Sequence, residues 1–299
     1  MSLSSKTLFR ACLALALTAA SALASAQTSF SATYKGGSTS TCGTTYSITG
    51  KEPSAAGKYP LYVYIGGTGE NYTSAWGAAT IDAAVARGMV AASVQYDNAS
   101  FGTCTTISTR AKCIFNPANA NSAIAKLCSR AKVDCSKGIV TGGLSQGSII
   151  SVLSKNYDSR IEASFGQGTG STYTVAYNLQ SCIANGNHAQ PGNRVRVING
   201  ERDMFVGGTE SIARSQAELV TGISCSGTST ECFQSNGAGW AVVKDYQLND
   251  LYADHCFMGL GTYGAQCTGI AAVDTNYKYG TGNWALPATM NWLATFVRP

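Results

Sequence analysis

Short apolar, β-rich runs alternate with helix-like segments along most of this chain, and this alternation limits the fold more than any other feature. Six runs are expected to form strands, at residues 61–65, 89–94, 138–141, 161–165, 195–199 and 240–246. The segments at 74–87, 118–132, 145–155, 209–219 and 284–297 are expected to form helices. Strands alternating with helices build a mostly parallel sheet with helices on both faces. The sequence therefore predicts an α/β fold, with an antiparallel edge hairpin at 28–49.

The first 26 residues have the three parts of a secretory signal. Lys6 and Arg10 make a cationic start, residues 11–20 are apolar, and Ala24-Ser25-Ala26 supplies small residues before Gln27. The apolar run is too short to span a bilayer, so no membrane anchor is expected. Residues 1–26 are interpreted as the signal peptide, and residues 27–299 are predicted to form one exported domain.

The charge balance argues against a nucleic-acid-binding protein. Without Lys6 and Arg10, 19 of the 21 basic residues remain against 16 acidic ones, a net charge of +3. The basic residues are scattered along the chain and do not form a patch with interleaved aromatic residues. No nucleic-acid partner is expected, and the protein is predicted to be a monomer.

Ten of the 11 cysteines follow the expected signal. An even number in an exported protein indicates a disulfide framework. Four expected pairs are close in sequence and the fifth follows by elimination: Cys104 with Cys113, Cys128 with Cys135, Cys225 with Cys232, Cys256 with Cys267, and Cys42 with Cys182. Zinc sites need ligands at short spacings such as C-x2-C, and the sequence has none, so no metal or other cofactor is expected.

The motif with the most chemical content is Gly143-Leu144-Ser145-Gln146-Gly147, a G-x-S-x-G pentapeptide. It follows the expected strand at 138–141 and leads into the expected helix at 145–155. A serine at such a junction lies on a strained turn, where larger residues two positions away would collide with the helix and the neighbouring strand. An ordinary glycine-rich turn is the alternative, but the placement favours Ser145 as a nucleophile.

A nucleophilic serine needs a base, and the chain has two histidines. His255 follows the last expected strand, which fits the order serine, acid, histidine. His188 lies in a polar loop before the expected acid, and we interpret it as a solvated loop residue. The sequence therefore predicts His255 as the base.

The acid that orients the histidine should follow a strand. Asp203 fits best, because the apolar run at 195–199 breaks at a glycine into its polar loop. A salt bridge with Arg202 is the alternative interpretation of Asp203. Glu201 is the first substitute, and Asp254 is poorly placed to reach the ring of its neighbour His255.

With these residues the chain resembles the α/β-hydrolase superfamily over residues 55–299. Residues 143–147 match the nucleophile elbow, Asp203 matches the acid of the Gly-x-x-Asp loop, and His255 matches the late histidine. The Ser-Gln-Gly form of the elbow is similar to that of cutinases and some acetylxylan esterases. The disulfide-rich exported setting resembles that of extracellular polyhydroxyalkanoate depolymerases.

The resemblance also implies two backbone donors for an oxyanion. The first is the N–H of Gln146, the residue after the nucleophile. The second comes from the glycine-rich loop at 65–70, where the family commonly has His-Gly and this chain has two glycines. Position favours Thr68, with Gly67 next. A phosphate-binding loop is the rival interpretation, but the G-x-x-x-x-G-K-[ST] pattern is absent from the sequence.

The function implied is hydrolysis of a carboxylic ester by two-step acyl transfer. The long segments 166–191 and 250–283 are expected at the rim of the site. Six aromatic residues could line a cleft for a polymeric or aryl ester, or could equally serve packing: Tyr72, Trp76, Tyr173, Tyr177, Tyr252 and Tyr263. The alternatives are a secreted serine peptidase and a hydrolase-fold binding protein with an idle triad.

Overall fold

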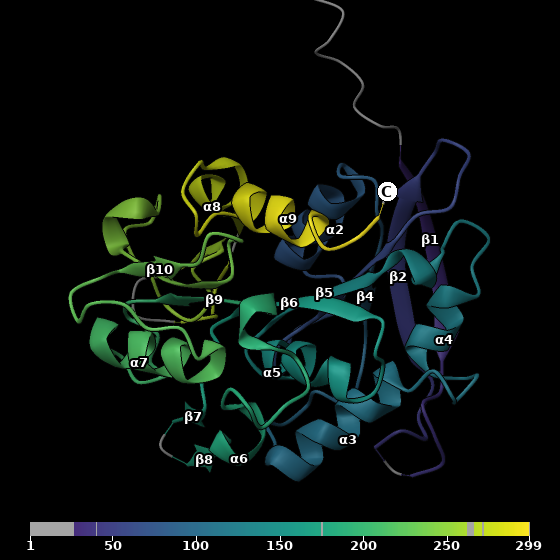
Figure 1. Cartoon of the computed structure of the whole chain (residues 1–299), viewed down its shortest axis with the longest axis horizontal. Helices are drawn as coiled ribbons and strands as arrows, with labels where there is room; N and C mark the ends of the chain where they lie inside the picture. Colours follow the sequence, from purple (N-terminus) through teal and green to yellow (C-terminus); the bar gives the residue numbers. More distant parts are fainter. Residues whose placement is uncertain (1–26, 40, 175, 262–265, 271, 299) are drawn as a thin grey trace, which may run out of the picture.

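A nine-stranded sheet forms the centre of the protein (Figure 1). The computed structural model describes residues 27–298 except 40, 175, 262–265 and 271, so the expected signal at 1–26 lies outside the described residues. The strand order is β1-β2-β4-β3-β5-β6-β9-β11-β10. The strands are β1 (Gln27–Tyr34), β2 (Tyr46–Pro53), β3 (Leu61–Ile65), β4 (Val90–Val94), β5 (Ile139–Leu144), β6 (Ile161–Gln167), β9 (Val195–Gly200), β10 (Glu231–Phe233) and β11 (Gly239–Val243).

The strands from β4 to β11 in this order run parallel, and the strands at the two edges are antiparallel. β3, β4, β9 and β11 are buried along their whole length, as expected for strands covered on both faces. This arrangement confirms the predicted α/β fold with a mostly parallel sheet. The expected edge hairpin is formed by β1 and β2.

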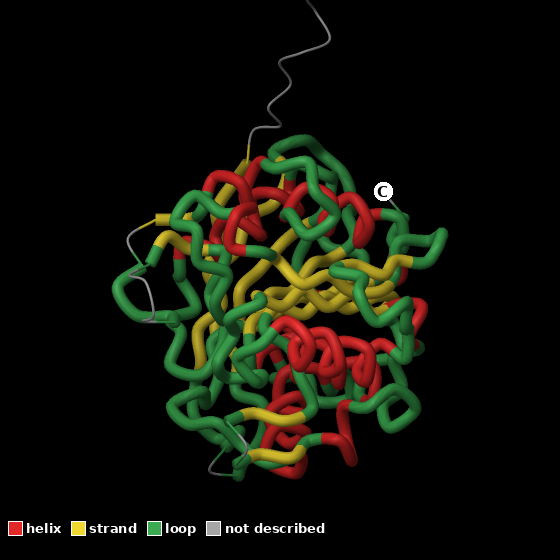
Figure 2. Tube along the Cα trace, turned by 90° about the vertical axis from the view of Figure 1, so that its left-hand side faces the viewer, coloured by secondary structure: helices red, strands yellow, loops and turns green. Residues whose placement is uncertain are grey.

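Helices cover both faces of the sheet, with α2, α8 and α9 on one side and α3, α5 and α7 on the other (Figures 1 and 2). The helices are α2 (Ala75–Val85), α3 (Cys104–Phe115), α4 (Ala123–Cys128), α5 (Gln146–Leu153), α6 (Gln180–Ile183), α7 (Glu210–Thr221), α8 (Thr275–Tyr279) and α9 (Leu286–Ala294). Two short hairpins are formed by β7 (Thr172–Tyr173) with β8 (Tyr177–Asn178), and by β12 (Gly259–Leu260) with β13 (Ala272–Val273).

The region between β4 and β5 differs from the prediction. The helix expected at 118–132 is confined to α4, because residues 116–121 form turns and the Ser122 side chain caps the helix by accepting the N–H of Ala125. α3 was not predicted. Its threonine-rich sequence has weak intrinsic helix propensity, so the helix depends on its packing against α5 and on the Thr103 cap.

The disulfides correct two of the five predicted pairs. Cys128–Cys135, Cys225–Cys232 and Cys256–Cys267 form as expected. Cys42 pairs with Cys113, and Cys104 pairs with Cys182. The predicted bridge between Cys104 and Cys113 is wrong because both lie in α3. They are nine positions apart in the helix, a rise of about 13 Å, which is beyond the roughly 7 Å limit between bridged Cα atoms.

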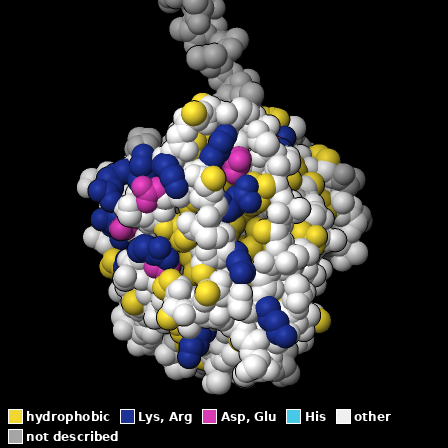
Figure 3. All heavy atoms as spheres, turned by 90° about the vertical axis from the view of Figure 1, so that its right-hand side faces the viewer, with side chains coloured by type: hydrophobic (Ala, Val, Ile, Leu, Met, Phe, Trp, Pro, Cys, Tyr) yellow, Lys and Arg dark blue, Asp and Glu magenta, His cyan; other side chains and the backbone are white. Residues whose placement is uncertain are grey.

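Charged side chains of both signs gather over the edge of the sheet that carries β1 and β2 (Figure 3). Lys51 pairs with Asp82 at 2.5 Å, and Arg130 pairs with Glu52 at 2.9 Å. Acidic partners therefore offset part of the positive charge on this face. Among the described residues, no helix combines the length and apolarity needed to cross a membrane.

Candidate active site

Ser145 occupies the sharp turn between β5 and α5. Its backbone has φ 54° and ψ −123°, a conformation that L-residues rarely adopt. A Cβ atom on Gly143 would lie 2.4 Å from the backbone of Gly147, and one on Gly147 would lie 2.1 Å from the carbonyl oxygen of Ile65. The helix and the neighbouring strand thus allow only glycine at both positions, as expected for the pentapeptide.

Asp203 lies in the loop after β9 and is fully buried. Its Oδ1 accepts the backbone N–H groups of Phe205 and Val206, at 3.0 and 3.1 Å. Its Oδ2 lies 2.7 Å from Nδ1 of His255. The loop therefore fixes the carboxylate by one oxygen and aims the other at the imidazole.

The His255 ring is enclosed on several sides. The Phe205 ring lies 4.7 Å from it, centroid to centroid, and the Tyr173 ring meets it edge-on at 6.4 Å. Gly168, at φ 55°, packs closely against the ring, because a Cβ there would lie 2.6 Å from Cε1 of the imidazole. Sequence reasoning missed Gly168, one of many glycines in a long loop segment.

The substitutes for the acid have other partners. Glu201 forms an ion pair with Lys244, and Arg202 pairs with Asp245 at 2.5 Å, so the alternative salt bridge of Asp203 with Arg202 is wrong. Asp254 turns to its own chain and accepts a backbone N–H two residues later, at 2.8 Å. Burial raises the pKa of Asp254 to about 7.

His188, the second histidine, lies outside the cavity that contains Ser145. It is half-buried, whereas the sequence predicted a solvated loop residue, and burial lowers its pKa. The imidazole paired with a carboxylate is thus the one expected from chain order.

The loop after β3 approaches the serine. Gly67 donates its N–H to Oε2 of Glu70 at 2.6 Å, so the second predicted choice for an oxyanion donor is already engaged. In the described part of the chain, no hydrogen bond uses the backbone N–H of Thr68 or of Gln146 as donor. Both amides are free to bind an oxygen atom of a substrate.

The side chain of Gln146 links the serine turn to the loop after β3 and to the segment before α3. Its Nε2 donates to Oγ1 of Thr68 at 2.8 Å and to the carbonyl oxygen of Ser100 at 3.1 Å. Its Oε1 accepts from the buried guanidinium of Arg110, which also donates to Ser100 O at 3.0 Å. Arg110 could not be found from sequence, since it reaches Gln146 only through the docking of α3 on α5.

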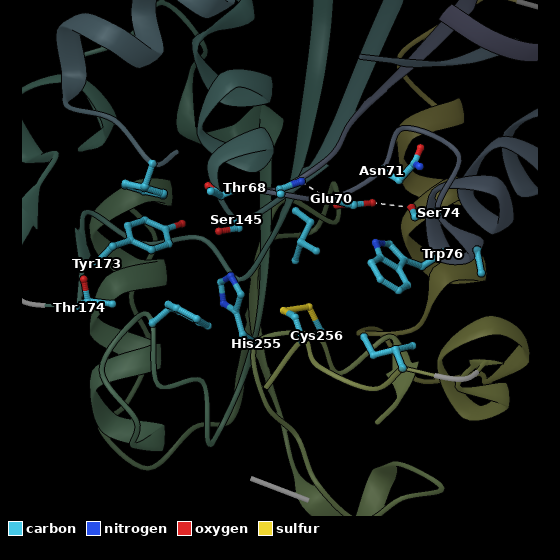
Figure 4. A pocket seen from close by; sticks show the side chains of 18 of the residues that line it. Thr68, Glu70, Asn71, Ser74, Trp76, Ser145, Tyr173, Thr174, His255 and Cys256 are labelled. Carbon is cyan, nitrogen blue, oxygen red and sulfur yellow. Dashed lines mark hydrogen bonds between the residues drawn. A yellow bond between two sulfur atoms is a disulfide. The ribbon is translucent and has the colours of Figure 1, made fainter. Parts of the chain in front are cut away.

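Glu70 is half-buried beside the serine turn, and its role was also missed. Besides Gly67 N, it accepts the hydroxyl of Ser74 at 2.5 Å (Figure 4) and the hydroxyl of Tyr64 at 3.0 Å. Burial raises its pKa, and these donors partly oppose the shift. Asn98 Nδ2 holds the same loop through the carbonyl oxygens of Gly67 and Glu70, at 2.7 and 2.8 Å.

Ser145 and His255 open into one cavity of about 710 Å³. The long segments 166–191 and 250–283 both supply part of its wall, as expected. Of the six predicted aromatic residues, Tyr263 lies outside the described residues, and Trp76, Tyr173 and Tyr177 line the cavity. Tyr72 and Tyr252 do not, and the Tyr252 ring lies 5.8 Å from the guanidinium carbon of Arg202.

Among the described residues, sequence reasoning missed two aromatic lining residues, Phe101 and Phe205. Phe101 precedes α3 and Phe205 follows Asp203, so only the folded arrangement brings them to the same wall. In the described residues, no group of three or more His, Cys, Asp or Glu side chains is placed to hold one metal ion.

The parallel strand order, together with a strained serine at the strand-to-helix turn after β5, decides the fold class. The chain has an α/β-hydrolase fold. No protein-family model matches it, and neither does any curated protein sequence.

Solved structures match only distantly. Fungal esterases from Rhizomucor miehei match with a TM-score of 0.44 and 13% identity, over 81% of each chain. The esterase Est22 matches with a TM-score of 0.37 and 14% identity, over 68% of this chain and 74% of its own. A hypothetical protein from Pseudomonas aeruginosa has a TM-score of 0.39 and 12% identity, and the match spans 55% of this chain but 48% of that protein.

Proposed function

We propose that this chain is a secreted serine hydrolase of carboxylic esters. The observation that carries the proposal is the buried contact of 2.7 Å between Asp203 and His255, in the same cavity as a serine held at φ 54°. A strained serine beside an oriented imidazole is the arrangement that nucleophilic acyl transfer requires.

In the first step, His255 accepts the proton of the Ser145 hydroxyl while Oγ attacks the carbonyl carbon of the ester. The negative charge that develops on the carbonyl oxygen is stabilised by the free N–H groups of Gln146 and Thr68. When the tetrahedral intermediate collapses, the bond to the alcohol oxygen breaks, and His255 returns its proton to that oxygen. Ser145 is left acylated.

In the second step, His255 removes a proton from water, and the hydroxide attacks the acyl carbon. The bond to Ser145 Oγ then breaks, and the serine takes the proton from the imidazole. Asp203 stabilises the imidazolium in both steps and holds Nδ1, so Nε2 faces the reaction. The two backbone N–H bonds to Oδ1 keep that carboxylate in place.

The cavity wall favours an ester over a peptide. A peptidase that grips a charged amine needs a free carboxylate, but the lining carboxyl of Glu70 already accepts three donors. The remaining wall is rich in aromatic and aliphatic side chains. An uncharged acyl group fits this lining better than an ammonium group.

Export is part of the proposal. Five disulfides are present in the described residues, and such bridges persist in oxidising compartments. The signal-like sequence of residues 1–26 supports the same conclusion.

The test is hydrolysis of p-nitrophenyl acetate, butyrate and octanoate by the purified mature protein, its Ser145→Ala variant and a Ser211→Ala control. Ser211 is an exposed serine in α7, so its variant should retain activity. We expect ester hydrolysis and labelling by a fluorophosphonate in the wild type and the control, and neither in Ser145→Ala.

Two outcomes would refute the proposal in different ways. Cleavage of p-nitroanilide peptides with no ester hydrolysis would make the protein a peptidase. A folded wild type that neither turns over an ester nor reacts with the fluorophosphonate would make it a binding protein with an idle triad.

A further inference from the structure

The cavity extends to both sides of the serine–histidine pair. In Figure 4, Tyr173 and Thr174 lie on one side of Ser145 and His255, and Trp76 lies on the other. The volume of about 710 Å³ is within the range of sites that enclose a whole small-molecule ligand. A group is therefore accommodated on each side of the reacting carbonyl.

The Phe101 lobe, as we name one side, consists of Phe101, Tyr173, Tyr177 and Phe205. The Phe101 ring lies 4.7 Å from Tyr173 and 4.9 Å from Tyr177. The Tyr173 hydroxyl donates to Gly168 O at 2.7 Å, which fixes that ring, and Phe205 O accepts the N–H of Thr174 at 2.9 Å. These contacts build an aromatic wall from three separate segments: the one before α3, the β7–β8 hairpin and the loop after β9.

The aromatic wall is not fully covered by the protein. Phe101 and Tyr177 are half-buried, and Phe205 is 37% exposed. When an apolar group displaces water from half-exposed rings that line a concave surface, the free energy of binding becomes more favourable. The Phe101 lobe is thus a binding surface for a flat apolar group.

The Trp76 lobe, on the other side, consists of Trp76, Ile270, Ala272 and the Cys256–Cys267 disulfide. Trp76 lies in the first turn of α2, β13 with Ala272 packs against that helix, and Ile270 comes just before β13. The disulfide lies between His255 and Trp76 (Figure 4). This second surface is also apolar, but it has one ring where the Phe101 lobe has four.

The described residues of the two lobes offer no cationic partner to an anionic substrate. The lining residues in the described part of the chain include neither lysine nor arginine. The carboxyl of Glu70 lies beside the Trp76 lobe and already accepts three donors. A substrate carboxylate would lose its hydration here without gaining a cationic partner.

We propose that the substrate is an uncharged ester with a bulky apolar group on each side of the scissile bond, one held in the Phe101 lobe and the other in the Trp76 lobe. This inference rests on the proposed ester hydrolysis by Ser145. It adds that the acyl and alcohol parts are recognised separately, by different residues.

The test compares four uncharged esters by pH-stat: benzyl 3-phenylpropanoate, methyl 3-phenylpropanoate, benzyl acetate and methyl acetate. Each phenyl group should raise kcat/KM by about tenfold or more, because each is buried against its own lobe. The two gains should multiply in the ester that carries both groups. Replacing one phenyl by a carboxylate should remove its gain.

Two variants show which lobe binds which side of the ester. Phe101→Ala should abolish the gain from the phenyl group on one side of the ester, and Trp76→Ala the gain from the other side. Tyr279→Ala is the matched control, since Tyr279 is 67% exposed and lies outside the cavity lining. Each gain is a ratio between esters for the same variant, so a lower fraction of folded protein does not affect it.

The outcomes separate the two proposals. Two results would overturn the two-lobe inference alone, provided that hydrolysis depends on Ser145. In the first, a second phenyl group gives no gain in kcat/KM. In the second, Phe101→Ala and Trp76→Ala lose the gain from the same side of the ester. A wild type that hydrolyses none of the esters, nor the p-nitrophenyl series, would overturn the proposed function and this inference with it.

Discussion

Removing the Cys256–Cys267 bridge should reduce activity far more than its contribution to stability implies. Cys256 follows His255 directly, is 1% exposed and lines the cavity, so the bridge anchors the loop that presents the imidazole. The bridge spans 11 positions. A loop of this length constrains the unfolded chain by about 3 kcal/mol in the chain-entropy account.

The matched control is the Cys128–Cys135 bridge. It spans 7 positions after α4, and neither cysteine lines the cavity of Ser145. The same account gives about 2.5 kcal/mol for its loss, nearly the same cost. The two double alanine variants should therefore unfold at similar denaturant concentrations.

Their activities should differ. A displacement of the imidazole by about 1 Å costs up to a hundredfold in rate, so Cys256→Ala/Cys267→Ala should lose at least about tenfold in kcat, and Cys128→Ala/Cys135→Ala less than about twofold. The assay is p-nitrophenyl butyrate hydrolysis under conditions where denaturation curves show both variants fully folded. Equal activity in the two folded variants would refute the reasoning, as would parallel loss of activity and ellipticity when the wild type is titrated with reductant.

Three further predictions concern the groups around the serine. Asp203→Asn should lower kcat/KM by about a thousandfold or more at unchanged ellipticity, because the amide cannot stabilise the imidazolium of His255; a loss under about tenfold would contradict this role. Gln146→Ala should lower kcat by roughly tenfold with little change in KM, because Thr68 loses its 2.8 Å tether; a rise in KM alone would contradict it. Burial raises the pKa of Asp254 from 3.8 to about 7, so the folded state holds a proton that the unfolded chain releases, and stability falls as pH rises across that window. The Tm of Asp254→Asn minus that of wild type should therefore increase between pH 4 and about 7; a constant difference would show that Asp254 does not titrate there.

Local sterics and chain order made much of the fold readable from the sequence. Fully apolar runs such as 61–65 identify strands buried on both faces, and their alternation with helices allows few arrangements other than a parallel sheet. Gly143 and Gly147 flank Ser145 because backbone atoms lie within 2.4 Å of where a side chain would begin. Such contacts involve neighbours in sequence or in adjacent strands, so a short motif records them.

The pairing of Asp203 with His255 was predicted from chain order, although 52 positions separate the two residues. The short bridges Cys128–Cys135, Cys225–Cys232 and Cys256–Cys267 were also predictable, because the ends of a short loop meet in most conformations. In each case the prediction needs no knowledge of tertiary packing, because it rests on the order of residues along the chain or on a short loop.

Tertiary structure alone decided the rest. Cys104 bonds to Cys182, 78 positions away, because α3 is rigid and holds Cys113 out of its reach. The cavity wall includes Phe101 and Phe205 from loops far apart in the sequence, while Tyr72 and Tyr252, which the sequence allowed as lining or packing residues, fall outside it. The sequence by itself singled out Ser145, Asp203 and His255 as the candidate residues, because a short motif and the order along the chain identify them. Which side chains surround that chemistry was decided by the packing of helices and loops, since contacts between distant segments leave no periodic or local signal in the chain.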